Sequence, residues 1–233
     1  MHLHIPDGVL PALVWAPALA VSLLLLVVSA RVRTRGTRQQ VAYQGALGAL
    51  ALAAMAIEIP LGPLEYHLTL VGPIGVLLGP AAAFEVMFIV NAILALLGHG
   101  GLTVVGLNAL VLGAGAALAR PAYMAFVRRF SPGTSLALGT VIAQVASGTL
   151  WLIVVGYALR AGATAGGPPV GASRWGLVAG LVFPMWLVGI AVESVVAVGI
   201  GRFLARVRPD LLPARVTAAA ELPGPDPRGV EAA

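Results

Sequence analysis

The chain has 233 residues, of which 59% are hydrophobic and 10% charged, and it carries a formal net charge of +5 with a mean hydropathy of +0.97. A soluble domain of this size cannot bury so much apolar surface, so the composition excludes a soluble globule and predicts a protein whose solvent is the bilayer. The sequence has neither lysine nor cysteine, which excludes lysine nucleophiles, disulfides and thiolate metal ligands.

Seven apolar segments follow one another along the chain, and we expect a membrane helix from each. Most have close to the roughly 20 residues that cross the hydrocarbon core. The third has about 12 and contains Gly72, Pro73 and Gly75, which favours a short or broken helix. The predicted fold class is an all-α polytopic membrane protein with about seven transmembrane helices, over Leu10 to Ala30, Val41 to Ile59, Leu68 to Gly79, Ala81 to Leu97, Leu102 to Leu118, Ser135 to Leu159 and Trp175 to Ala205.

The arginines predict the orientation of these helices, because basic residues concentrate in cytoplasmic loops. With the N-terminus outside, twelve of the 14 arginines fall on the inner side and only Arg160 and Arg174 on the outer side. We therefore expect an outside N-terminus and an inside C-terminus in the cell membrane. Residues 1–208 form one predicted transmembrane domain, and the Pro-rich residues 209–233 a disordered cytoplasmic tail.

The histidines are the most informative polar residues, because His2, His4, His67 and His99 all fall on the predicted outer face. A free α-amine, the amide nitrogen of residue 2 and Nδ1 of His2 can close a five-membered and a six-membered chelate ring on one metal ion. A fourth nitrogen, from an imidazole such as His67, completes a plane of donors that Ni(II) and Cu(II) favour. The residues therefore predict a metal-binding domain.

Several motifs carry a family resemblance. Met1-His2 and the run from His4 to Pro11 begin the chain, the segment from His67 to Pro80 follows the second helix, and two motifs, Gly100 to Thr103 and Gly106 to Asn108, follow the fourth. In this order they resemble the CbiM/NikM family, the cobalt/nickel substrate-capture components of energy-coupling-factor (ECF) transporters.

This resemblance implies a seven-helix protein that binds Co(II) or Ni(II) outside the cell through Met1, the histidine that follows it and a loop histidine. The metal is then the transported substrate, and no organic cofactor or nucleic acid is implied. Transport needs a transmembrane coupling subunit and ATPase subunits, with room for a small accessory membrane protein.

The N-terminus departs from the family pattern. In the family the histidine before Ile-Pro-Asp-Gly follows the initiator methionine, whereas here that histidine is His4, with Leu3 before it. Two interpretations stay open: either His2 is the chelating residue and His4 an extra ligand, or translation starts at Leu3 and His4 takes the second position.

Other polar residues have expected supporting roles. Asn108 is a candidate to orient His67 as a second-shell partner, with hydrogen bonding to the backbone of a neighbouring helix as the equal alternative. Asp7 is expected to hold the turn into the first helix, and His99 is interpreted as a loop residue in preference to a ligand. The intramembrane carboxylates Glu85 and Glu193 are functional candidates by position.

The function that fits best is the metal-binding subunit of a transporter. An enzyme is unsupported, because the sequence lacks a zinc-protease helix, a histidine within the spans and a redox cysteine. The alternative is a secondary metal permease that works alone, coupled through Glu85 and Glu193. Small residues such as Ala16 and Ala20, or Gly176 and Gly180, are spaced for close helix contact with a partner.

Overall fold

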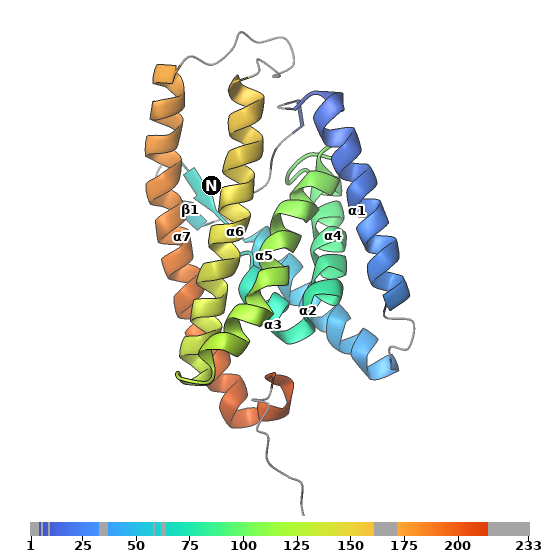
Figure 1. Cartoon of the computed structure of the whole chain (residues 1–233), viewed down its shortest axis with the longest axis vertical. Helices are drawn as coiled ribbons and strands as arrows, with labels where there is room; N and C mark the ends of the chain where they lie inside the picture. The colour runs from blue at the N-terminus through green and yellow to red at the C-terminus, as the bar shows by residue number, and fades with distance from the viewer. Residues whose placement is uncertain are drawn as a thin grey trace, which may run out of the picture.

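The structure is a computed structural model, and it describes residues 5, 7–8, 10–32, 37–57, 59–61, 64–160 and 172–213. Within these residues, seven α-helices form one bundle (Figure 1). A two-stranded antiparallel hairpin, with Ile59 opposite Tyr66, joins the second helix to the third. The elements are α1 (Ala12–Val32), α2 (Arg38–Ala56), β1 (Ile59–Leu61), β2 (Leu64–Tyr66), α3 (Val71–Leu78), α4 (Pro80–Leu96), α5 (Val105–Phe126), α6 (Pro132–Arg160), α7 (Ala172–Val207) and the 3₁₀ turn η1 (Pro209–Leu211).

The predicted fold class is confirmed. Each predicted apolar segment overlaps one helix, and α1, α5, α6 and α7 each contain a stretch long and apolar enough to cross a bilayer. α4 is apolar but shorter, with 17 residues. The chain is therefore a multi-pass membrane protein. Of the predicted tail, residues 209–213 are described: they include η1 and the buried Leu212, while residues 214–233 lie outside the described part.

The third helix is as short as its glycines and proline predict. α3 has eight residues, or about 12 Å of helix, against a hydrocarbon core of about 30 Å. It is enclosed by α4, α5 and α6, so its Val71, Ile74 and Val76 are almost completely buried. A Cβ at Gly75 would collide with the backbone of Ala116 on α5, so the absence of a side chain lets these helices meet.

Helix α1 lies against the bundle through a similar close approach. Gly106 of α5 packs on the backbone of Leu19, and the hydroxyl of Ser22 donates a hydrogen bond to the Gly106 carbonyl at 2.5 Å. Because lipid cannot satisfy a hydroxyl, this bond ties a polar group of α1 to α5. The opposite side of α1, which includes Ala16 and Ala20, is exposed.

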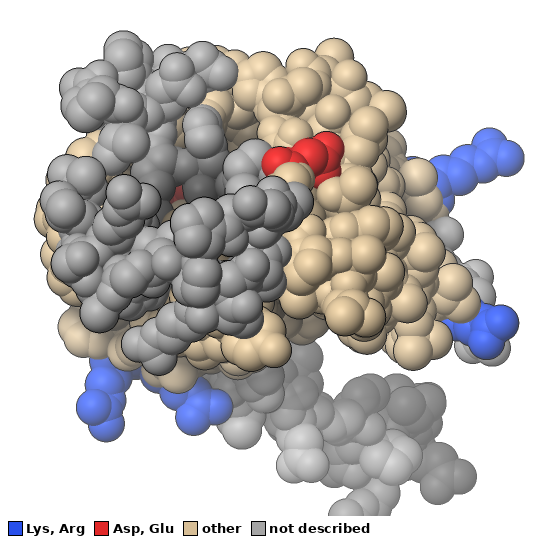
Figure 2. All heavy atoms as spheres, turned by 90° about the horizontal axis from the view of Figure 1, so that it is seen from above, with Lys and Arg blue, Asp and Glu red and all other residues tan. Residues whose placement is uncertain are grey.

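Most of the described arginines lie at one end of the bundle; Arg160, which ends α6, and Arg174, in the first turn of α7, lie at the other. α1 ends beside Arg31, α2 begins at Arg38, Arg128 and Arg129 follow α5, and Arg206 lies in the last turn of α7, all at the lower end in Figure 1. Seen from above, the opposite end shows acidic atoms on its face, and the visible arginines project only around its margin (Figure 2). The end rich in arginine is the one that we expect to face the cytoplasm.

The contact at Gly75 gives a prediction about stability. Gly75→Ala should lower the melting temperature of the detergent-solubilised protein, because the new methyl group must separate α3 from α5; overpacking of this kind costs about 1–3 kcal/mol. Gly199→Ala is the matched control, since its Cβ meets no atom within 4 Å and Gly199 is exposed on α7. Circular dichroism melts of both variants would test this, and equal melting temperatures would contradict the packing assigned to Gly75.

Candidate metal-capture site

Three of the four predicted ligands, Met1, His2 and His4, lie outside the described residues. The fourth, His67, is described and is buried, with 8% of its surface exposed. The site is therefore built here from the segment that follows His4, the segment that carries His67 and the turn between α4 and α5 (residues 97–104).

Asn108 holds the start of the described chain. Its Oδ1 accepts the backbone N–H of Ile5 at 2.8 Å, and its Nδ2 donates to the Ile5 carbonyl at 3.1 Å. Asn108 is buried near the beginning of α5, and Ile5 packs into an apolar cluster with Leu107 and Val155. These bonds go to the backbone of Ile5, the residue after His4, and not to a neighbouring helix as the alternative role expected.

Asp7 fastens the same segment to the α4–α5 turn. Its carboxylate accepts the backbone N–H groups of Leu102 and Thr103, both at 2.9 Å, and the hydroxyl of Thr103. The hydroxyl hydrogen bond is the main reason why the pKa of Asp7 lies below its ordinary value of 3.8. Since a lowered pKa means that the bonds favour the ionised form, this contact is kept at neutral pH and lost only in acid below that value. Gly101 packs directly on Asp7, where a side chain would collide with it.

Glu193 of α7 holds the segment that carries His67. Its Oε1 accepts the backbone N–H of Thr69 at 2.5 Å and the Thr69 hydroxyl at 2.7 Å. The Tyr66 hydroxyl lies 3.4 Å from the same oxygen and donates to the carbonyl of Gly189 at 3.0 Å. Gln144 of α6 donates to the Thr69 hydroxyl at 2.9 Å. His67 thus lies between two residues that α6 and α7 hold in place.

His99 is the residue that the structure brings to His67. The two imidazole rings lie edge to face, with centroids 6.1 Å apart and planes at 89°. The turn around His99 is set by Gly98 and Gly100, whose φ angles of 86° and 88° favour glycine. In addition, the backbone N–H of His99 donates to the Leu94 carbonyl at the end of α4, at 2.8 Å.

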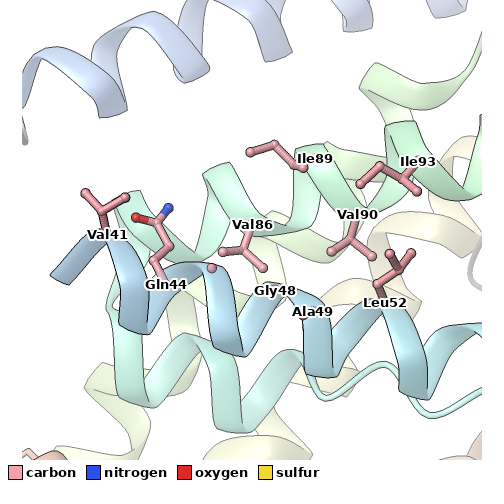
Figure 3. Close-up of a pocket in the computed structure, with 10 residues that line it drawn as sticks. Val41, Gln44, Gly48, Ala49, Leu52, Val86, Ile89, Val90 and Ile93 are labelled. Carbon is pink, nitrogen blue, oxygen red and sulfur yellow. The ribbon is translucent and has the colours of Figure 1, made fainter. Parts of the chain in front are cut away.

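Glu85 lies in a different part of the bundle. It is half-buried on α4, and Gln44 of α2 donates to its Oε2 at 2.8 Å. Gln44 also lines an apolar groove of about 450 Å³ between α2 and α4, whose other lining residues include Leu52, Val86 and Ile93 (Figure 3). Glu85 and Glu193, considered together in the sequence, therefore have separate surroundings and separate partners.

Sequence reasoning missed two features of this site. It placed Glu193 inside a span but had no means of linking it to Thr69, which is 124 residues away in the chain. It also treated His99 as an isolated loop residue. The flanking glycines of His99 gave the signal for a tight turn, yet only the packing of that turn on the His67 segment makes the two imidazoles neighbours.

The comparison with protein families gives a match over most of the chain. Residues 4–211 match the family described as the cobalt uptake substrate-specific transmembrane region, CbiM. The chain belongs to the CbiM family. This assignment confirms the resemblance seen in the sequence and the prediction of a transport protein that is not an enzyme. CbiM proteins are substrate-specific components of cobalt uptake, so cobalt is the substrate that the family indicates.

Two solved structures share the CbiM fold seen here. One, described as a truncated transition metal transporter, is 23% identical, with a TM-score of 0.74 over 87% of this chain and 98% of its own. The other, described as a transition metal transporter, is 22% identical, with a TM-score of 0.75 over 88% of this chain and 93% of its own. No curated protein matches the chain significantly.

The contacts of Glu193 predict how it supports the segment that carries His67. Glu193→Ala should weaken metal binding by the purified protein, because Thr69 and Tyr66, on either side of His67, lose their contact with α7. Glu193→Gln keeps an acceptor oxygen and should keep most of the affinity. Glu85→Ala is the matched control, since it removes a carboxylate that bonds with Gln44 instead. Calorimetric titration of the three variants would test the role, and equal affinities in Glu193→Ala and the wild type would refute it.

Proposed function

We propose that this CbiM chain is the substrate-binding membrane subunit of an ECF importer and that it captures Co(II) or Ni(II) at the extracellular face. The observation that supports this most strongly is a convergence of three segments. The residues just after the amino terminus are bonded to the α4–α5 turn, and that turn holds His99 against His67.

The proposed ligands are the α-amine of Met1, the amide and imidazole nitrogens of His2, and the imidazole of His67. Asn108 and Asp7 act behind them by fastening Ile5 and the turn. Four residues precede Ile5, which Asn108 holds in place. Because an extended chain spans at most about 3.6 Å per residue, this anchor limits how far the amine can lie from the site. If translation begins at Leu3, His4 replaces His2 as the chelating residue.

Energy for transport is proposed to come from partner subunits. The sequence has no Gly-x-x-x-x-Gly-Lys phosphate loop, so the chain has no nucleotide site of that kind. The exposed side of α1 that carries Ala16 and Ala20 offers a surface of small residues for a transmembrane coupling subunit. The two carboxylates that a stand-alone permease would use are engaged with Thr69 and Gln44, and this favours the capture subunit.

The amine and His67 give the decisive test of capture. His67→Ala should abolish Co(II) and Ni(II) binding by the purified protein, because one of the four in-plane donors is lost. A tag fused ahead of Met1 should have the same effect, because it converts the amine into an amide. The same tag at the C-terminus is the control and should be harmless. Calorimetry with each metal, together with mass spectrometry of the native terminus, would measure this.

Two results would count against this site. Full metal binding by the N-terminally tagged protein would refute ligation by the amine, and full binding by His67→Ala would refute the imidazole. Retained folding of each variant, checked by its helical circular dichroism and melting temperature, ensures that a loss of binding reports on the ligands.

The exposed side of α1 gives a prediction about coupling. Replacing Ala16 and Ala20 with leucine should leave metal binding unchanged but abolish ATP-dependent uptake in vesicles that also contain the coupling and ATPase subunits, because close helix contact is blocked. Val21→Phe is the bulk control on the same helix, because Val21 is exposed but lies about 100° or more around α1 from Ala16 and Ala20. Uptake by the chain alone, driven by a proton gradient, would instead favour the permease.

A further inference from the structure

The groove between α2 and α4 is kept open by small residues of α2 (Figure 3). A Cβ at Gly45 would meet no atom within 4 Å, and one at Gly48 would make only an ordinary contact with Val86 at 3.6 Å. The packing of these helices therefore does not require glycine at either position, in contrast to Gly75. The two glycines instead leave a space of about 450 Å³ beside α4.

This groove is apolar and faces the bilayer. All of its lining residues except Gln44 are aliphatic or glycine, and Gln44 donates its amide hydrogens to the Ala82 carbonyl and to Glu85. At the edges of the groove, Val41 is 61% exposed and Ile89 is 52% exposed. Because the hydrocarbon core holds no water that could fill such a space, the group that occupies it is apolar.

The dimensions of the groove suit a lipid chain and not a helix. It follows α2 from Val41 to Leu52, about 16 Å of helix at 1.5 Å per residue, which is close to half of a hydrocarbon core of about 30 Å. A helix with its side chains is about 10 Å across, so the same length of helix would take up roughly 1,200 Å³. A hydrocarbon chain about 4–5 Å wide needs roughly 300 Å³. A space of about 450 Å³ therefore accommodates one acyl chain but not a helix of a partner subunit.

The groove begins at the arginine-rich end of the bundle. Arg38 is the first residue of α2, is exposed, and lies three residues before Val41. The guanidinium of Arg120 lies beside Gly79, the residue that precedes α4. Glu85, the acidic residue of α4, is held by a hydrogen bond from α2. Since each arginine near a membrane surface favours anionic lipid by about fivefold, the charge at this end complements a phosphate headgroup.

We propose that the α2–α4 groove binds one acyl chain of an anionic phospholipid from the leaflet at the arginine-rich end, with the lipid phosphate beside Arg38. The chain runs from Val41 towards Leu52 and Ile93, which line the far part of the groove. This lipid site is separate from the metal-capture site and from the exposed side of α1. A bound chain fills the seam between α2 and α4 and so stabilises their packing, because a ligand that binds only the folded state stabilises it.

Native mass spectrometry of the detergent-solubilised protein, with phosphatidylglycerol or phosphatidylcholine of the same acyl chains added, tests the groove. Gly45→Leu should weaken phosphatidylglycerol binding more than tenfold, because each methylene displaced from the groove weakens it about fourfold. Gly199→Leu is the matched control and should bind like the wild type, since Gly199 is another exposed glycine with open space around its Cβ, on α7.

The headgroup is tested with the same two lipids. Arg38→Gln should lower the preference for phosphatidylglycerol over phosphatidylcholine about fivefold and leave phosphatidylcholine binding unchanged. Arg206→Gln, which removes an exposed arginine from the last turn of α7, is the control and should keep the preference.

A labelled lipid gives a measurement that needs no variant. The wild-type protein is placed in vesicles of phosphatidylglycerol that carries a diazirine at the end of one acyl chain, and the vesicles are irradiated. Peptide mass spectrometry should find more label at Leu52 and Ile93 than on the exposed face of α7 around Gly199. This result decides the proposal if Gly45→Leu has a lowered melting temperature.

Three results would overturn the lipid site. Equal loss of phosphatidylglycerol in Gly45→Leu and Gly199→Leu would mean that lipid covers the apolar surface without preferring the groove. Unchanged binding in Gly45→Leu would exclude the groove, and if that variant also failed to copurify with a coupling subunit, a partner helix would be the occupant instead. Equal binding of the two lipids by the wild type would exclude recognition of the headgroup at Arg38.

Discussion

In a bilayer, a backbone that leaves a helix must find its hydrogen-bond partners within the protein, and the arrangement of this site depends on that constraint. Three irregular segments meet near His67, and a polar side chain holds each of them. Asn108 binds both backbone groups of Ile5, Asp7 accepts two N–H groups of the α4–α5 turn, and Glu193 accepts the N–H of Thr69. The polar residues of this hydrophobic chain thus serve to keep loops in place.

The same contacts bear on the proposed role of the amino terminus as a metal ligand. A chain terminus is ordered only where it is tied down, and the ordering of each residue costs conformational entropy. Here the ties at Ile5 and Asp7 lie within the first seven residues and end on two different elements, α5 and the turn before it. In the proposed site, these ties reduce the ordering that the amino-terminal segment needs when the amine binds a metal ion.

Close helix packing supplies the rigid frame for these loops. Gly75 lets α3 meet α5, Gly106 lets α5 meet α1, and Gly189 of α7 accepts the ring of Tyr66, the residue before His67. Because lipid chains are as apolar as the side chains, association inside the membrane relies on such contacts and not on a hydrophobic driving force. The glycines therefore influence the position of His67 as well as the fold.

Composition, hydropathy and motifs were enough to predict the bilayer as solvent, the helices and the family. Apolar stretches of membrane length can only be helices in a bilayer, so the seven elements, including the short α3, followed from hydropathy and the placement of glycine and proline. Cysteine is absent, so thiolate donors are excluded, and the motifs around Asp7, His67 and Asn108 indicated the family. Which side chains meet depends instead on the packing of the helices. The partners Asp7 and Thr103, Thr69 and Glu193, and His67 and His99 are separated by 96, 124 and 32 residues, and no local periodicity encodes such pairs, because they depend on how helices from distant parts of the chain pack together.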